Sequence, residues 1–347
     1  MEFLAEYGIF LAKTLTILFS LLVFVLVVVS AGQKHRKADK GYVEVTHLNQ
    51  HLEEITSALK QVVLEPEDFK KELKAQKSEK KAARTKKKKA SEEESAEQSR
   101  VFVLDFDGDI KASQVSALRE EVTAILSIAN EKDAVVVRLE SPGGLVHAYG
   151  LAASQLKRIV DRNIDLTVAV DKVAASGGYM MACVANRIIA APFALLGSIG
   201  VVAQIPNFHR LLKKNDIDVE VLTAGEYKRT LTLFGENTDK DRQKFLEDME
   251  DVHTLFKQFV SENRPAVNIA EVATGEAWYG TRALAHQLVD ELKTSDELIS
   301  EFCQSARVFN VKYVIHKKGL DKIMEKVASI YHKGFPGAQD VVPEKHF

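Results

Sequence analysis

Ser176 stands within a stretch of small residues, Val173 to Ala182, whose composition could support nucleophilic chemistry. An apolar run at 166–170 precedes Ser176 and an Ala- and Met-rich segment follows it, so the serine is expected where a strand passes into a helix. At a helix N-terminus, free backbone N–H groups and the helix dipole favour developing negative charge. The adjacent glycines leave room for a substrate backbone. An N-cap serine on a buried helix has the same local pattern, so this stretch alone supports either role.

Two other turns rich in small residues could complete such a site. Gly143 and Gly144 follow Ser141-Pro142 between an expected strand and an expected helix. Their N–H groups could stabilise an oxyanion or bind an extended peptide, although Pro-Gly turns are common. Ser198, in the motif GSIGV, could be a plain turn residue or a hydroxyl that supports a catalytic group.

Lys228 follows in the charged turn GEYKR, where most lysines are simply solvated. A lysine can act as the general base for a serine only where burial lowers its pKa from about 10.4 toward about 7–8. The alternative base is the histidine of a Ser-His-Asp triad, but no GxSxG motif surrounds Ser176, and chain order alone neither supports nor excludes a triad. Four histidines lack a recognisable triad context: His147, His209, His253 and His286. A Ser-Lys pair is therefore favoured.

Composition limits the function classes. With 347 residues the chain has room for one large or two medium domains, and a formal net charge of −2 argues against a global nucleic-acid-binding field. The two cysteines, Cys183 and Cys303, form neither a CxxC motif nor a zinc-like cluster. A disulfide framework is therefore not expected, and Cys183 is expected to be a buried thiol.

The N-terminal region has the pattern of a membrane anchor. Residues 14–33 contain no charged side chain, and at about 1.5 Å per residue they span about 30 Å, the thickness of a bilayer's hydrocarbon core. The long apolar run and the acidic start favour a retained transmembrane helix, after a short tail at 1–13, over a cleaved signal peptide. Four basic residues after the span favour the cytoplasm for the rest of the chain: Lys34, Arg36, Lys37 and Lys40.

Between the anchor and residue 101 the sequence changes character. Residues 41–64 have helical apolar spacing, which predicts a juxtamembrane helical segment over 34–64, either amphipathic or self-associating. Residues 65–100 have few apolar side chains and contain a lysine-rich block followed by glutamates, which predicts a flexible charged linker. Binding of the lysine block to anionic lipid is the functional alternative.

From residue 101 onward, strand-like and helix-like segments alternate, which predicts an α/β domain with mostly parallel strands over 101–310. The expected strands are 101–106, 134–139, 166–170, 187–191, 201–205 and 219–222, and the expected helices are 113–129, 145–160 and 239–262. The uncharged segment 188–209 is not expected to cross a membrane, because turn residues such as Pro192, Gly197 and Pro206 interrupt it. Residues 311–347 are assigned to a C-terminal extension without an interpretable motif.

The motifs SPGG, AASGGYMMA, GSIGV and GEYKR, in this order, make the chain similar to the signal-peptide-peptidase-A family of membrane serine proteases. With one N-terminal span, a lysine-rich tether and one catalytic unit, it most resembles the SohB branch, over about residues 101–300. The resemblance implies a fold like that of the Clp-protease and crotonase superfamily, a spiral of β-β-α units. It also implies a bacterial inner-membrane location with a periplasmic catalytic domain, which conflicts with the basic residues after the span.

The resemblance further implies roles for the site residues. Ser176 would be the nucleophile, Lys228 its general base, and Ser198 the hydroxyl that orients Lys228. An oxyanion hole would be formed by backbone N–H groups of glycines: Gly177 with Gly143 or Gly144. No cofactor or metal is implied. The expected partners are polypeptide substrates (signal peptides, membrane or misfolded proteins), the lipid bilayer and further copies of the chain in a ring, where serine and lysine can come from neighbouring subunits.

Two other functions stay open at the level of sequence. A crotonase-like acyl-CoA enzyme would use paired N–H groups to bind a thioester enolate and would need no serine nucleophile. A catalytically silent membrane scaffold would only bind polypeptides. Covalent labelling of Ser176 would count against the first, and turnover of any peptide would count against the second.

Overall fold

The computed structural model describes residues 2–32, 41–71, 74, 78 and 99–315. The chain divides into two compact units, and residues 43–313 form the unit that holds both sheets and all candidate site residues. In the other unit, α1 (Glu2–Gly32) is one continuous helix. Across the described residues, no helix is both long enough and apolar enough to span a bilayer. The anchor expected at 14–33 stays a prediction.

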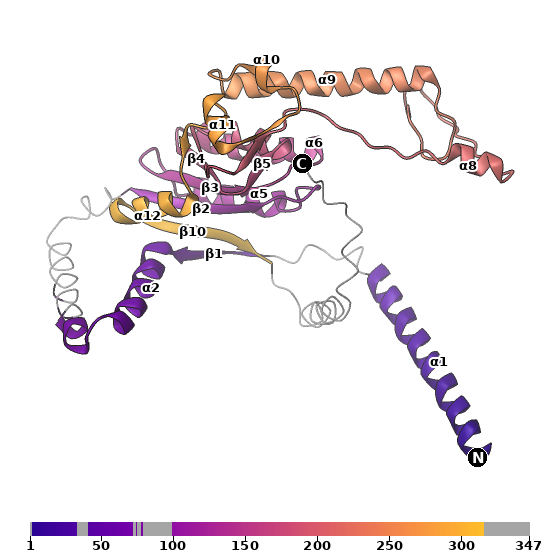
Figure 1. Cartoon of the computed structure of the whole chain (residues 1–347), viewed down its shortest axis with the longest axis horizontal. Helices are drawn as coiled ribbons and strands as arrows, with labels where there is room; N and C mark the ends of the chain where they lie inside the picture. The colour runs from indigo at the N-terminus through magenta and orange to yellow at the C-terminus, as the bar shows by residue number, and fades with distance from the viewer. Residues whose placement is uncertain (1, 33–40, 72–73, 75–77, 79–98, 316–347) are drawn as a thin grey trace. The chain divides into compact units, whose positions relative to one another are not determined.

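Two sheets organise residues 43–313 (Figure 1). The larger has seven strands in the order β1-β10-β2-β3-β4-β6-β9, and its described pairs from β10 through β9 are parallel. The smaller has three strands, β5 parallel to β7 and β7 antiparallel to β8. The strands are β1 (Tyr42–His47), β2 (Arg100–Asp107), β3 (Ala134–Glu140), β4 (Asp165–Val170), β5 (Val173–Ala175), β6 (Arg187–Ala190), β7 (Leu195–Gly197), β8 (Ala277–Tyr279), β9 (Glu291–Leu292) and β10 (Arg307–Val314).

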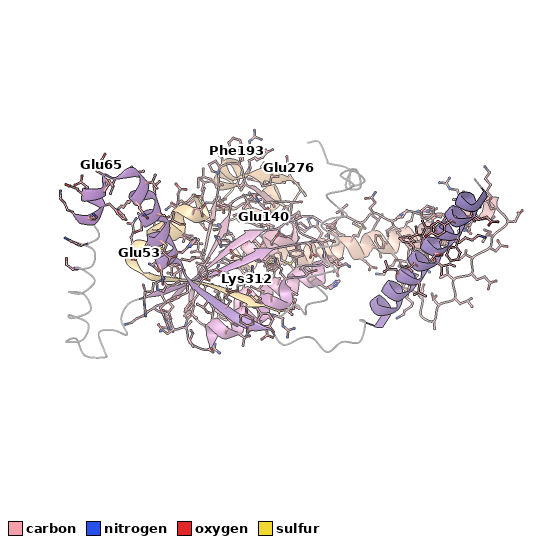
Figure 2. All side chains as sticks on the ribbon, turned by 90° about the horizontal axis from the view of Figure 1, so that it is seen from below. Glu53, Glu65, Glu140, Phe193, Glu276 and Lys312 are labelled. Atoms are coloured by element: carbon pink, nitrogen blue, oxygen red, sulfur yellow. The ribbon has the colours of Figure 1, made fainter. Side chains whose placement is uncertain are left out.

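Helices cover both faces of the large sheet. The helices of this unit include α2 (Leu48–Val63), α5 (Val115–Leu126), α6 (Val146–Val160), α7 (Gly177–Ala182), α8 (His209–Lys214), α9 (Asp239–Asn263), α10 (Ile269–Val272), α11 (Gly280–Ala285) and α12 (Ser295–Ser305). Of these, α5, α6 and α7 cover one face and α12 packs on the other, whereas α8 has no buried residue and lies away from the sheet (Figure 1). Charged side chains such as Glu53 of α2 and Lys312 of β10 lie at the surface (Figure 2).

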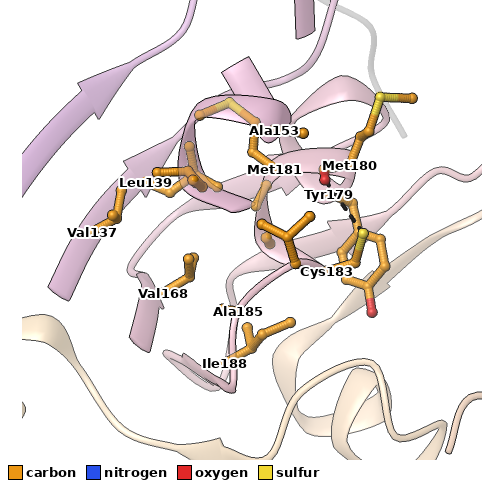
Figure 3. Packing of buried hydrophobic residues seen from close by; sticks show 14 of the residues in the cluster. Val137, Leu139, Ala153, Val168, Tyr179, Met180, Met181, Cys183, Ala185 and Ile188 are labelled. Carbon is orange, nitrogen blue, oxygen red and sulfur yellow. Dashed lines mark hydrogen bonds between the residues drawn. The ribbon is translucent and has the colours of Figure 1, made fainter. Parts of the chain in front are cut away.

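Side-chain alternation along β2 divides the core into two clusters. Phe102 and Leu104 point to the face covered by α5, α6 and α7, whereas Val101 and Val103 point to the face where Leu298 of α12 packs. The central strands β2, β3 and β4 are apolar on both faces, as is typical of buried parallel strands. Figure 3 shows residues of α6 and α7, among them Ala153 and Met181, packed on the larger cluster. Cys183 is fully buried there, as expected, and burial raises its pKa to about 12.

The structure corrects several expected elements. Residues 201–205 and 219–222, expected as strands, have no regular secondary structure. The segment 41–64, expected to be helical, starts as the strand β1 before α2 begins. The strand β10 continues to Val314, past the boundary expected at 310. Most of the expected linker (65–100) and of the C-terminal extension lies outside the described residues.

An ion pair between a buried arginine and a partly exposed aspartate fixes the end of α9 to the sheet. Arg264, whose side chain is 8% exposed, donates to both carboxylate oxygens of Asp290, at 3.1 and 2.9 Å. Asp290 also accepts from the N–H of Ile188 in β6 at 2.6 Å. Burial opposes ionisation of Asp290, but these hydrogen bonds outweigh it and lower its pKa. Asp290 therefore stabilises the fold above the ordinary carboxyl pKa of about 4, and this stabilisation is lost as the pH falls through the lower folded-state value.

We expect Asp290→Ala to lower the free energy of unfolding by about 3 kcal/mol at pH 7, because Arg264 is left buried and unpaired. Urea unfolding followed by circular dichroism measures this, and the gap to wild type should narrow at acid pH. Asp248→Ala, which removes an exposed i,i+4 partner of Lys244 on α9, is the matched control and should cost about 0.5 kcal/mol or less. Equal losses in the two variants would contradict the assignment.

Candidate active site

Ser176 joins β5 to α7 in a strained backbone conformation. Its φ of 52° and ψ of −117° lie outside the regions that non-glycine residues prefer. Such a conformation costs about 1–3 kcal/mol and is characteristic of functional turns. The Ser176 side chain does not cap α7, although Ser176 is the N-cap residue. The half-buried hydroxyl is therefore not used to stabilise the helix, which argues against the simple N-cap role.

Ser198 lies beside Ser176 because their strands are neighbours. β5 and β7 run parallel with Ala175 opposite Gly197, so each serine follows directly at the carboxyl end of its strand. The N–H of Ser176 donates to the carbonyl of Gly197 at 2.7 Å. Ser198 also has a positive φ, 51°. The structure thus brings together two serines that are far apart in sequence.

The Gly143-Gly144 turn packs directly against the Ser176 turn. A Cβ atom on Gly143 would lie 2.7 Å from the carbonyl oxygen of Ala175 and 2.8 Å from the nitrogen of Gly177. Gly143 also has a φ of +89°, so both its space and its backbone require glycine. Its N–H donates to Ser141 Oγ at 3.1 Å.

The N–H groups of Gly144 and Gly177, in contrast, make no hydrogen bond to any described residue. They are the available donors of the glycine cluster, whereas Gly143 shapes the turn. Gly177 begins α7 directly after Ser176, and all residues of that short helix are buried. The arrangement places a hydroxyl and two unused N–H donors around one small volume, which is the set of groups that acyl transfer requires.

A narrow apolar cavity opens beside Ser176. Its lining includes side chains from α6, α7 and α9, such as Val146, Met180 and Phe256, together with the glycines Gly144, Gly177 and Gly200. Phe256 itself is buried. A cavity this narrow and apolar fits a small uncharged side chain next to the serine.

Lys228 is exposed and lies elsewhere along α9. The neighbouring residues of its turn contact the N-terminal half of that helix: Glu226 pairs with Lys240 at 2.7 Å, and the Tyr227 ring lies near Lys240 and Lys244. The cavity of Ser176 instead contacts Val252 of α9. From Lys240 to Val252 the helix rises by about 18 Å. The structure therefore does not bring Lys228 and Ser176 of one chain together, and Figure 1 shows α8 near the end of α9 remote from α10.

Sequence reasoning missed several residues that shape this site. Tyr149 of α6 is fully buried and contacts Ser141, and Val252 and Phe256 come from α9. The sequence carried no signal for them, because each reaches the site through tertiary packing alone. His253 binds the carbonyl of Ile199, with 3.3 Å from Nε2 to the oxygen, and makes no hydrogen bond to Ser176.

We expect Gly144→Ala to lower kcat by about 100-fold, because the new Cβ would lie 2.1 Å from the carbonyl oxygen of Ile110 and must displace the turn that carries the free N–H. The rate of acyl transfer and thermal melting measure the effect. Gly150→Ala is the control, because nothing lies within 4 Å of a Cβ at this position in α6. That variant should keep full activity and gain about 0.5–1 kcal/mol of stability. Full activity of Gly144→Ala would contradict the assignment of this turn to the active site.

Comparisons with known proteins match nearly the whole chain to one family. Residues 2–156 match the model of the peptidase family S49 N-terminal region, and residues 158–309 match the model of peptidase family S49. The chain belongs to peptidase family S49 and is therefore a protease. This agrees with the signal-peptide-peptidase-A resemblance of its motifs.

Two bacterial relatives show the extent of the likeness. The probable protease SohB of Haemophilus influenzae is 53% identical over 96% of this chain and 96% of its own length. The probable protease SohB of Buchnera aphidicola subsp. Schlechtendalia chinensis is 48% identical over 86% of this chain and 99% of its own. Among solved structures, a mutant of the 1510-N membrane-bound stomatin-specific protease in complex with a substrate peptide aligns with a TM-score of 0.40 and 12% identity. That alignment covers 67% of this chain and 99% of the other.

Proposed function

We propose that the chain is a serine endopeptidase with Ser176 as nucleophile and Lys228 as general base. One observation carries the proposal: Ser176 is held at a φ of 52° with its hydroxyl unused, beside the free N–H groups of Gly144 and Gly177. Strain of this kind persists only where the surroundings impose it. Membership of peptidase family S49 supports hydrolysis of a peptide bond.

In the proposed reaction, Ser176 Oγ attacks the scissile carbonyl while Lys228 Nζ accepts the hydroxyl proton. The N–H groups of Gly144 and Gly177 donate to the oxyanion of the tetrahedral intermediate. Lys228 then returns the proton to the leaving amine, and an acyl-enzyme forms on Ser176. Water, deprotonated by the same lysine, hydrolyses the ester. Ser198 orients Lys228 by a hydrogen bond from beside the nucleophile.

The dyad is proposed to form between subunits of a homo-oligomeric ring. Glu226, two residues before Lys228, pairs with Lys240 of α9, and the helix rises by about 18 Å from Lys240 to Val252 at the cavity of Ser176. This separation supports a base supplied by a neighbouring chain. The segment that carries it exposes large apolar side chains, including Val202 at 91% and Leu222 at 89% exposure. Exposed apolar surface of this kind is typical of interaction sites. A neighbouring copy would cover it and receive the lysine.

We further propose that the fold is the spiral of β-β-α units that the family resemblance implies, and that the chain is anchored in the bacterial inner membrane. The uncharged run at 14–33 supports an anchor. A reporter fused after residue 347 distinguishes a periplasmic from a cytoplasmic catalytic domain. Signal peptides and misfolded membrane proteins fit as substrates, because the cavity beside Ser176 accepts a small apolar side chain.

The test is cleavage of a peptide library by the full-length protein in detergent, with products identified by mass spectrometry. We expect cuts after small uncharged residues. Cuts confined to positions after charged or bulky aromatic residues would contradict the assigned cavity. A complete lack of peptide turnover by the assembled protein would contradict the endopeptidase itself.

A further inference from the structure

Tyr149 connects the two turns that flank the candidate oxyanion donors. It is fully buried on α6, and its hydroxyl lies 2.6 Å from Ser141 Oγ and 2.8 Å from the carbonyl oxygen of Asp109. Ser141 begins the SPGG turn, and Asp109 lies in the turn between β2 and α5. The proposed mechanism gives Tyr149 no role, although it is one of the largest fully buried side chains.

The direction of each of these linked hydrogen bonds is fixed. A carbonyl oxygen can only accept, so the one hydroxyl proton of Tyr149 is donated to Asp109. Ser141 must then donate its own proton to Tyr149 Oη. That leaves the lone pairs of Ser141 Oγ to accept the N–H of Gly143. The series of hydrogen bonds therefore has one direction, from the N–H of Gly143 to the carbonyl of Asp109, and Tyr149 lies in the middle of it.

The same tyrosine also supports the other donor by packing. A Cβ on Gly177 would lie 2.4 Å from Tyr149 Cγ, so the start of α7 rests on the ring. On the other side, Gly144 lies against Ile110, whose carbonyl accepts the N–H of Leu145 at 2.9 Å. The ring of Tyr149 therefore contacts Gly177, and its hydroxyl binds Ser141 and Asp109. These residues belong to the segments that include or contact Gly144 and Gly177.

We propose that Tyr149 is the positioning residue that sets the spacing between the N–H groups of Gly144 and Gly177. This inference rests on the proposed function. Without the hydroxyl, the hydrogen-bond chain opens at its centre and the SPGG turn loses its connection to Asp109, while the ring still supports Gly177. The cost falls on stabilisation of the oxyanion and not on substrate binding, because Tyr149 touches no open part of the cavity.

The hydroxyl remains a donor under working conditions. Burial raises the pKa of Tyr149 above its ordinary value of about 10, so the proton needed for the bond to Asp109 is present at neutral pH. The chain of hydrogen bonds is therefore a fixed part of the folded protein and is not a switch.

The test compares two buried tyrosines in full-length protein. Tyr149→Phe should lower kcat for fluorescein-labelled casein by about 10–100-fold with KM nearly unchanged, since full loss of one oxyanion donor costs about 10²–10³-fold. A peptidyl aldehyde, whose adduct on Ser176 mimics the tetrahedral intermediate, should bind more weakly by a similar factor. Ser141→Ala should behave in the same way, and the double variant should be no worse than either single one, because the residues act as one unit.

Tyr179→Phe is the matched control. Tyr179 of α7 is equally buried, and its hydroxyl also donates to a backbone carbonyl, that of Leu288 at 2.9 Å. Both variants should lower the melting temperature by similar amounts, and only Tyr149→Phe should lose activity. Equal activity in the two variants, alongside an inactive Ser176→Ala, would overturn this inference alone. Full activity of Ser176→Ala would instead overturn the proposed function.

Discussion

Replacement of Ser176 by alanine is expected to lower kcat for peptide hydrolysis by about 10⁴-fold or more, because the proposed acyl-enzyme forms on its hydroxyl. Alanine keeps the Cβ atom, so the strained backbone at a φ of 52° is unchanged and the melting temperature should stay close to that of wild type. The measurement is steady-state cleavage of labelled casein by full-length protein, with melting followed by circular dichroism.

Ser154→Ala is the control for the Ser176 prediction. Ser154 is an exposed serine of α6 that donates to the carbonyl of Gly150 at 2.8 Å, away from the cavity. Its replacement should leave kcat and KM unchanged. If Ser176→Ala retained as much activity as Ser154→Ala, the nucleophile would have to be sought elsewhere in the chain.

Replacement of Lys228 by alanine should be nearly as harmful, but its loss should be repairable by a second chain. Lys228→Ala removes the proposed base from one subunit, and Ser176→Ala removes the nucleophile from another. In a head-to-tail ring of mixed subunits, about a quarter of the sites would receive an intact serine from one copy and an intact lysine from the next. Mixing two inactive proteins should therefore restore about that fraction of wild-type activity.

Three controls make the mixing experiment decisive. Each variant alone must stay inactive at the same total concentration, and subunit exchange must be shown by cross-linking of differently tagged chains. Lys214→Ala, which replaces a lysine at the end of α8, should behave as wild type, because that side chain is exposed and belongs to no candidate site. If the exchanged mixture stayed inactive, the serine and lysine would not come from different subunits.

The regular core could be predicted from the sequence. The strands β2, β3, β4 and β6 and the helices α5, α6 and α9 fall where apolar periodicity places them, because long buried segments carry a strong pattern. β5, β7 and β8 have three residues each, too few for a periodic signal. The apolar segments 201–205 and 219–222 suggested strands, but a strand needs a partner, and side chains such as Val202 and Leu222 are exposed.

The candidate site was predictable only in part, for a related reason. The glycines of the turns, and the serine between a strand and a helix, can be predicted from the local sequence, because tight turns restrict which residues fit. The adjacency of Ser176 and Ser198 depends on β5 pairing with β7, which no local pattern shows. In the sequence, Tyr149 has the pattern of an ordinary core aromatic on the apolar face of a helix. Its significance lies in its contacts to Ser141, eight residues before it, and to the more distant Asp109 and Gly177.

Peptide mapping after reaction with a fluorophosphonate tests the central claim most directly. The reagent phosphonylates an activated serine with loss of fluoride, and mass spectrometry of the digested protein identifies the modified residue. The prediction is a single adduct on Ser176, formed in step with loss of casein hydrolysis and absent from Ser176→Ala. A protein that loses its peptidase activity with the adduct on another residue, or that stays fully active with Ser176 labelled, would contradict the assignment of Ser176 as the nucleophile.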